Sequence, residues 1–180
     1  KIALRPKITR ADMTVLFIEE LNLTELFKRF MPPAASSGFQ TPAQMMSQGN
    51  APLPGDVRGS WAEGWIEEAM KLGVVEADPD GNFYPAQWVT RANYARAVVK
   101  ILSMVRRDQT LETKYIGENP SRFSDVPSSH FAYSSIALCS ELGIMKADFV
   151  TGGFNPTGNV GGADALLIIR TVQTSLRVTF

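Results

Sequence analysis

Two arginines stand where the sequence predicts that helices begin, and their chemistry is the binding of anions. Arg10 follows Thr9 and Arg91 follows Thr90, with an apolar helical pattern after each pair. A threonine before a helix accepts a hydrogen bond from a free backbone N–H group. An arginine in the first turn adds a permanent planar cation to the partial positive charge there, which suits a carboxylate. The alternative is a helix cap followed by a solvated charge.

Carboxylates and aromatic rings accompany these pairs. Asp56 and Asp125 each precede a predicted helix, and Trp61 and His130 stand near the start of that helix. The aromatic faces can stack on a ligand, whereas the carboxylates can equally brace the turns before their helices. For His130 both a structural and a ligand-facing role stay open. Trp61 can also pack into the core, and for Trp65 we favour that role because it lies on the apolar stripe of its helix.

These residues recur because the chain is built from repeats. The skeleton of residues 56–91 returns in residues 125–162. Both segments carry Asp-Val, an aromatic-Ala pair, an Ile, Leu-Gly, and then Gly-Phe or Gly-x-Phe before x-Pro. Chance similarity is a poor explanation for so many matches in one order.

A third, partial copy opens the chain. Residues 8–12 match 89–93 and 160–164, and an apolar helical pattern follows each of the three segments. The first copy therefore has only the back half of the unit. In the last copy Gly161-Gly162 replace Thr-Arg, so at most two of the three copies keep the arginine.

Helical periodicity predicts a mainly α fold, in which each repeat is a helix, a glycine stop, an irregular loop and a second helix, with little or no sheet. The first apolar pattern predicts a helix that continues to about Phe30. Ser60 is the expected N-cap of the next helix. Gly73 and Gly143 fit the left-handed position after a helix.

The repeats and the composition between them define the organisation of the chain. Residues 31–55 contain no charged residue and are rich in Pro, Ala and Gln, which is typical of a linker. The expected segments are a partial first repeat (1–30), this linker (31–55), a second repeat (56–107), a connecting segment (108–122), a third repeat (123–175) and a tail (176–180).

Composition excludes several classes of function. Eighteen Lys and Arg balance eighteen Asp and Glu, so no broad attraction draws the chain to nucleic acid or an anionic membrane. No apolar run approaches the roughly 20 residues of a transmembrane helix. One Cys and one His provide no cluster for a soft metal, and we expect no cofactor. Asp78 to Gly81 reads as a turn rather than a calcium loop, since Gln87 stands where the bidentate Glu belongs.

The ordered motifs Asp-Val, aromatic-Ala, Leu-Gly, Gly-x-Phe-x-Pro and Val-Thr-Arg-Ala resemble the S-layer homology (SLH) domain. Residues 56 to about 105 match it closely, 123 to about 174 match it except at Gly161-Gly162, and 5–30 match its second half. The resemblance implies a module present in three copies, arranged as a helical body with pseudo-threefold symmetry.

The resemblance also implies a function without catalysis. Such modules anchor exported proteins to the cell surface, cell wall or S-layer, with the periplasmic envelope as an alternative location. Their ligand is a cell-wall glycan, often a secondary polymer whose terminal sugar carries a pyruvate ketal, which is a carboxylate. The implied contacts in grooves between copies are Thr9, Arg10, Asp56, Trp61, Thr90, Arg91, Asp125 and His130.

Two other functions stay open. A degenerate module that has lost glycan binding can dock a partner protein or associate with itself. An envelope enzyme can carry this chain as an appendage, with its catalytic domain elsewhere. The anchor and the docking module differ in one structural feature, which is whether Arg10 and Arg91 face open grooves or are used by internal ion pairs.

Overall fold

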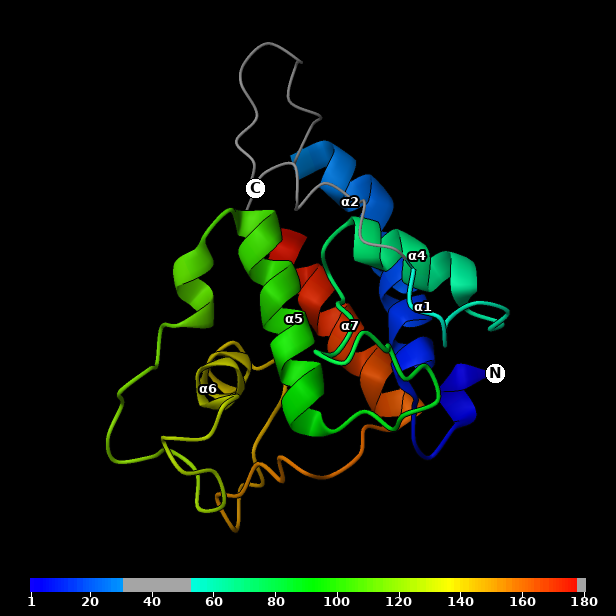
Figure 1. The fold of residues 1–180 in the computed structure, drawn as a ribbon. Helices are drawn as coiled ribbons and strands as arrows, with labels where there is room; N and C mark the ends of the chain where they lie inside the picture. Colours follow the sequence, from blue (N-terminus) through cyan, green and yellow to red (C-terminus); the bar gives the residue numbers. More distant parts are fainter. Residues whose placement is uncertain (31–52, 178–180) are drawn as a thin grey trace. The chain divides into compact units, whose positions relative to one another are not determined.

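The computed structural model describes residues 1–30 and 53–177, which form two compact units. One unit lies within residues 9–87, and the other combines residues 1–8 with residues from 88 onward. Figure 1 traces the helices and loops along the chain. The described residues contain helices and no sheet, which confirms the predicted mainly α class. Most of the predicted linker lies outside the described residues, and the pseudo-threefold arrangement stays a prediction.

The unit within residues 9–87 is built around α1 (Arg10–Glu20), which packs against α2 (Leu23–Phe30) and α4 (Glu63–Lys71). The sequence predicts one helix up to Phe30, but the structure divides it at Asn22. That residue adopts a φ of 49°, and asparagine tolerates the left-handed region better than most residues. The largest buried side chains of this unit include Phe17, Leu23, Ile66 and Phe83.

The start of α4 differs from the prediction. Its N-cap is Ala62 rather than Ser60, and the Ser60 hydroxyl accepts a hydrogen bond from the Ala62 N–H at 3.3 Å in the preceding turn. Trp65 is only half-buried, because its indole Nε1 donates to the carboxylate of Glu19 at 2.6 Å. An indole that reaches a surface carboxylate keeps its polar edge in contact with water, so the expected core packing of Trp65 is incomplete.

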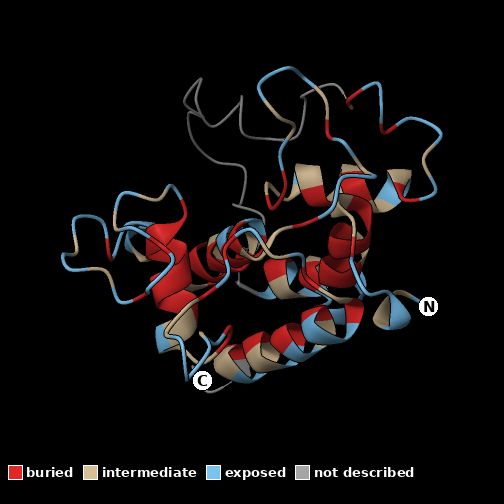
Figure 2. Cartoon of the chain, turned by 90° about the horizontal axis from the view of Figure 1, so that it is seen from below, coloured by how far each residue is buried: buried red, intermediate tan, exposed pale blue. Residues whose placement is uncertain are grey.

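The second unit contains η1 (Ile2–Leu4), α5 (Arg91–Arg106), η2 (Gln109–Glu112), α6 (Tyr133–Glu141) and α7 (Gly162–Arg177). Helix α5 packs against α6 and η2, and α7 contacts η1. Figure 2 shows that buried residues concentrate in the helices, with α6 buried over most of its length, while the loops are largely exposed. The largest buried side chains of this unit include Ile8, Tyr94, Ile101, Leu102, Tyr133, Ile136, Leu138 and Phe154.

A closed ring of three backbone hydrogen bonds joins equivalent residues of the three copies within this unit. The N–H of Ile8 donates to the carbonyl of Val160 at 2.9 Å. The N–H of Val160 donates to Val89 at 3.1 Å, and that of Val89 donates to Ile8 at 3.0 Å. All three side chains are buried. Ile8, Val89 and Val160 each precede the Thr-Arg or Gly-Gly pair of their copy. The hydrogen bonds therefore bring the three copies together at this one position.

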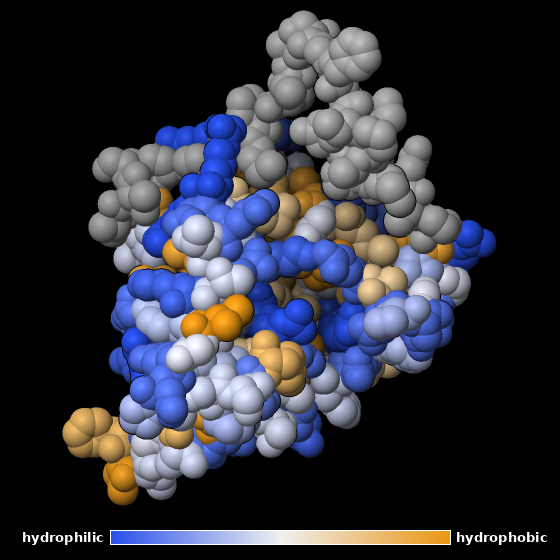
Figure 3. All heavy atoms as spheres, turned by 60° about the vertical axis from the view of Figure 1, so that its left-hand side comes forward, coloured by the Kyte–Doolittle hydropathy of each residue, from blue (hydrophilic) through white to orange (hydrophobic). Residues whose placement is uncertain are grey.

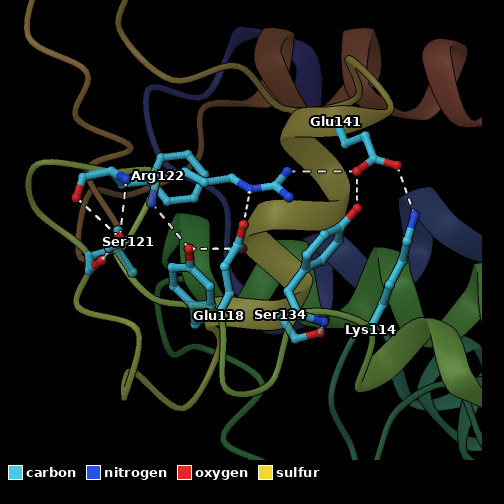
Figure 4. A network of polar contacts seen from close by, with 10 residues as sticks. Lys114, Glu118, Ser121, Arg122, Ser134 and Glu141 are labelled. Atoms are coloured by element: carbon cyan, nitrogen blue, oxygen red, sulfur yellow. Dashed lines mark hydrogen bonds and ion pairs between the residues drawn. The ribbon is translucent and has the colours of Figure 1, made fainter.

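The connecting segment is fastened to α6 by the polar network of Figure 4. Tyr115 is buried, and its hydroxyl donates to the carboxylate of Glu141. Lys114 pairs with Glu141 at 2.8 Å, and the Arg122 guanidinium lies 3.6 Å from the same carboxylate. The N–H of Tyr115 donates to the Ser134 hydroxyl on α6 at 3.2 Å. The segment is therefore held by specific polar contacts, although it has few apolar residues.

Glycines end two of the helices as predicted. Gly73 after α4 has a φ of 71°, and Gly143 after α6 has a φ of 67°. A glycine adopts these values without the steric cost that a Cβ atom brings. The turn after each helix is thereby directed into the loop that carries the Gly-Phe or Gly-x-Phe motif.

The surface in Figure 3 is mostly hydrophilic, with isolated hydrophobic side chains. Among the described residues, Phe149 and Val150 are the most exposed large apolar side chains, and they lie at the tip of a loop. Among the described helices, none combines the length and apolarity needed to cross a bilayer.

Candidate ligand-binding site

The two threonines cap their helices as predicted. The Thr9 hydroxyl accepts from the Asp12 N–H at 3.2 Å, and the Asp12 carboxylate accepts from the Thr9 N–H at 3.0 Å, which completes a capping box. The Thr90 hydroxyl accepts from the Asn93 N–H at 3.2 Å. These caps fix the start of α1 and α5, so that Arg10 and Arg91 occupy the first helical position.

Arg10 lies over the ring of Phe83, and we call these two residues with Asp56, Glu76 and Asp78 the first Arg–Phe cluster. The guanidinium carbon is 4.6 Å from the centre of the ring. Nη1 donates to the Asp78 carboxylate at 3.1 Å, and Nη2 donates to the Glu76 carbonyl at 3.0 Å. The positive charge of Arg10 is therefore paired inside the protein.

The equivalent arrangement around Arg91 is the second Arg–Phe cluster, made of Arg91, Asp125, Lys146, Asp148 and Phe154. The guanidinium carbon of Arg91 is 4.5 Å from the centre of the Phe154 ring. Nε donates to the Phe154 carbonyl at 2.8 Å, and Nη2 donates to the Lys146 carbonyl at 2.9 Å. Both partners are neutral. In the described part of the chain, Arg91 makes no ion pair.

Partial burial shapes the electrostatics of Arg91. Desolvation lowers the pKa of its guanidinium, and the nearby carboxylates of Asp164 and Asp125 act in the opposite direction. Arginine stays protonated at any physiological pH. The second cluster therefore presents a permanent, half-buried cation whose orientation is set by two carbonyl groups and an aromatic ring.

The carboxylates of Asp56 and Asp125 hold the two phenylalanine loops. Asp56 accepts hydrogen bonds from the N–H groups of Phe83, at 3.0 Å, and Tyr84, at 2.6 Å. Asp125 accepts from the N–H groups of Phe154, at 2.7 Å, and Asn155, at 2.6 Å. They brace a loop that lies 27 to 30 residues further along the chain, rather than the turn before their own helix.

The third copy has no such cluster at Gly161-Gly162. The N–H of Gly162 donates to the carbonyl of Arg5 at 2.8 Å, and η1 packs against α7. A Cβ atom on Gly162 would lie 1.9 Å from the carbonyl oxygen of Ile2. The N-terminal segment of the chain therefore fills the space that a side chain at this position would need.

The predicted aromatic contacts lie at the surface. Trp61 is 57% exposed, and its ring centre is 6.2 Å from that of Trp65. His130 stacks on Phe131 at 4.5 Å between ring centres, and its Nδ1 accepts from the Ala132 N–H at 3.2 Å. Phe131 is 67% exposed. The contacts of the described residues do not join Trp61 or His130 to the Arg–Phe clusters.

The sequence nominated the two arginines as ligand contacts, but it did not indicate the phenylalanine rings that lie against them. Phe83 and Phe154 were part of a repeated motif without an assigned role, and Asp78 was interpreted only as a turn residue. The phenylalanine of each Gly-x-Phe or Gly-Phe motif stands at the same distance from the Thr-Arg or Gly-Gly pair of its own copy, but Phe83 and Phe154 lie against the arginines of the preceding copies, Arg10 and Arg91. The repeated spacing therefore gave no signal for these pairings, although a guanidinium over an aromatic face is a common arrangement.

Comparisons with known proteins assign two segments of the chain to a family. Residues 55–95 and 122–166 match the S-layer homology domain. An uncharacterized cell wall amidase of Bacillus anthracis is 33% identical over 68% of this chain and 21% of its own length. S-layer protein EA1 of Bacillus anthracis is 30% identical over 63% of this chain and 12% of its own length. Cell surface glycoprotein 1 of Acetivibrio thermocellus is 27% identical over 90% of this chain and 6% of its own length.

Several of the matched proteins are named as proteins of the cell surface. They include S-layer proteins and a cellulosome-anchoring protein, and the matched family supports a cell-wall anchoring module. The predicted location, an exported protein of the cell surface or cell wall, is confirmed. The chain spans about a fifth or less of the length of the relatives named above.

Proposed function

Because this chain belongs to the S-layer homology domain family, we propose that it anchors its protein by binding an anionic cell-wall polysaccharide without catalysis. The ligand group that fits best is a carboxylate, such as the pyruvate ketal of a secondary cell-wall polymer. The catalytic activities named for some relatives belong to those proteins, and we assign none to these residues.

The observation that carries the proposal is the second Arg–Phe cluster. Arg91 is half-buried, has no ion-pair partner among the described residues, and is held in place by Phe154 and the Lys146 carbonyl. A fixed guanidinium loses little conformational entropy when it binds, and a half-buried one is less screened by salt than an exposed one. A carboxylate is the complementary partner, since the two groups form charge-assisted hydrogen bonds.

Thr90 and Asp125 support this contact without touching the ligand in our proposal. Thr90 fixes the helix start that carries Arg91, and Asp125 fixes the backbone of Phe154 beneath it. Trp61 and Phe131 offer exposed aromatic rings on which sugar rings can stack, and the half-buried His130 lies against Phe131. Their participation stays a prediction.

The test is sedimentation of the chain with isolated cell-wall sacculi, before and after chemical removal of pyruvate ketals. Arg91→Ala should lower the binding affinity by about 1.5 to 3 kcal/mol, which is at least about tenfold. Arg170→Ala is the matched control, because Arg170 is an exposed arginine on α7 of the same unit. If neither ketal removal nor Arg91→Ala lowers the affinity for the sacculi, the proposed carboxylate ligand is wrong.

The second candidate is a module that docks a partner protein or assembles with itself. It is favoured by the internal use of Arg10, whose charge is paired with Asp78, and by the closed position at Gly162. The same assay separates the candidates. A folded chain that fails to sediment with intact sacculi, and that elutes as a dimer or larger species in size-exclusion chromatography, supports the docking module.

A further inference from the structure

The loops that contact the two arginines share one backbone frame. The N–H of Asp78 donates to the Asn82 carbonyl at 2.8 Å, and the N–H of Asp148 donates to the Gly153 carbonyl at 2.7 Å. Each aspartate also accepts a backbone hydrogen bond from a glycine at the end of the turn. The loop that follows Asp148 contains one residue more before its phenylalanine. The two aspartates therefore occupy equivalent places.

Their carboxylates point to different partners. The Asp78 carboxylate binds Arg10 across 3.1 Å. The Asp148 carboxylate instead accepts hydrogen bonds from the hydroxyl of Thr151, at 2.9 Å, and from its N–H, at 2.7 Å. The N–H of Val150 adds a third bond at 3.0 Å. The loop after Asp78 passes through Pro79-Asp80-Gly81 and has no hydroxyl residue to offer.

The different partners of the two aspartates determine whether the charge of each arginine is neutralised. The Arg10 and Asp78 side chains are 19% and 38% exposed, so their ion pair is partly shielded from water. Within residues 1–30 and 53–177, the hydrogen-bond partners of Arg91 are two backbone carbonyls, and the Asp148 carboxylate is held by its own turn. The residue that gives its carbonyl to the arginine is Glu76 in the first cluster and Lys146 in the second. The second cluster is therefore the more positive of the two.

The other acids near Arg91 leave it accessible to a ligand. Asp125 and Asp164 lie close enough to favour the charged form of Arg91, but neither forms an ion pair with it in the described structure. The Asp125 carboxylate is already occupied by two backbone N–H groups. Asp164 is exposed on α7, where water screens its charge.

We propose that Asp78 is a built-in carboxylate that occupies the first cluster in place of an external one, whereas Thr151 keeps the second cluster open by holding Asp148. This inference rests on the proposed function, since it assigns the anion to one of two similar sites. According to this inference, Asp78 and Thr151 determine whether the chain has one anion site or two. Neither residue touches the ligand in the second cluster.

The experiment titrates sacculi that retain their pyruvate ketals with four variants of the whole chain. Asp78→Asn removes the internal charge and keeps the side-chain shape, so the apparent affinity should rise at least about threefold through a second attachment point. In the Asp78→Asn background, a further Arg10→Ala change should reverse that gain. Thr151→Val releases Asp148 toward Arg91 and should lower the affinity at least about threefold, whereas Thr151→Ser should keep it.

Circular dichroism of each variant establishes that it is folded, and the outcomes then separate the two proposals. A gain in Asp78→Asn that needs Arg10, together with a loss in Thr151→Val, supports the inference. If the unmodified chain needs Arg91 for binding but Asp78→Asn gains nothing, the inference is wrong and the proposed function stands. If binding of the unmodified chain depends on neither Arg91 nor the ketals, the proposed function itself is wrong.

Discussion

The carbonyl oxygen of Ile2 lies 1.9 Å from the point where a Cβ atom on Gly162 would stand. Real Cβ atoms do not approach backbone oxygens so closely, so any side chain at Gly162 must displace η1 from α7. The glycine is thus a consequence of close packing between two distant parts of the chain. An arginine placed here would not rebuild a third Arg–Phe cluster.

We expect Gly162→Ala to destabilise the protein by about 1 to 3 kcal/mol, the usual cost of forcing extra atoms into a packed site. Urea denaturation followed by circular dichroism measures this change. Gly161→Ala is the matched control, because the nearest atom to its added Cβ is the Pro6 carbonyl oxygen at 3.4 Å, an ordinary contact. Equal midpoints for the two variants would contradict the close approach of Ile2.

Asp125→Ala should destabilise the second unit by about 1 to 2 kcal/mol, because the partly buried N–H of Phe154 and the exposed N–H of Asn155 lose a charged acceptor. It should also weaken wall binding, since Phe154 would no longer be held beneath Arg91. The measurement is urea denaturation combined with sacculus sedimentation. Glu67→Ala removes a carboxylate from an exposed ion pair with Lys71 and should change stability by at most about 0.5 kcal/mol. A stable Asp125→Ala protein with normal binding would contradict the bracing role.

Local features were predictable because their signals lie within a few residues. Thr9 and Thr90 were recognised as helix caps, and Gly73 and Gly143 as helix ends, since each needs only its own turn of backbone. The Thr-Arg pairs were placed at helix starts for the same reason. The family resemblance followed from the order of many such local signals and was confirmed.

Features that depend on distant contacts were not predictable. The role of Gly162 depends on Ile2, which is 160 residues away in the chain. The ion pair of Asp78 depends on Arg10, which is 68 residues away in the chain, whereas Asp148 is held by the hydroxyl of Thr151 in its own turn. Both aspartates begin similar turns in the sequence, so periodicity and turn propensity give them the same interpretation. Only the three-dimensional contacts separate them.

At acidic pH, the free energy of unfolding should fall partly because Asp148 becomes protonated. Hydrogen bonds from the backbone and hydroxyl of Thr151, and then from Val150, hold the pKa of its carboxyl below the ordinary value of 3.8. A lowered pKa in the folded state means that the stabilisation is fully present above about pH 4 and is lost as the pH falls through the folded-state pKa. Carbon-13 NMR of the side-chain carboxyl measures this pKa directly.

Thr151→Val provides the comparison for this titration. The variant removes the hydroxyl donor but keeps the backbone N–H, so the pKa of Asp148 should move upward toward 3.8 without reaching it. The same pKa in both proteins would mean that the hydroxyl does not hold the carboxylate in solution. That result would also remove the support for Thr151 as the residue that keeps the second Arg–Phe cluster open.

Glu141→Ala should loosen the connecting segment, because one carboxylate accepts from the Tyr115 hydroxyl and pairs with Lys114 and Arg122. The three charged side chains are 40% to 44% exposed, so we discount the ion pairs and expect a loss of about 1 kcal/mol, mainly from the buried tyrosine. Limited trypsin digestion under native conditions gives a local readout. Cleavage after Lys114 should become several-fold faster.

Glu25→Ala is the control for this prediction, because Glu25 forms an exposed ion pair with Lys28 across 2.7 Å and touches no buried hydroxyl. It should leave cleavage after Lys114 unchanged. Proteolysis of a native protein follows the population of locally opened molecules, so it detects a loosened segment even when the core helices stay folded. Equal cleavage rates in the Glu141→Ala and Glu25→Ala proteins would show that the packing of Tyr115, rather than its bond to Glu141, fastens the segment to α6.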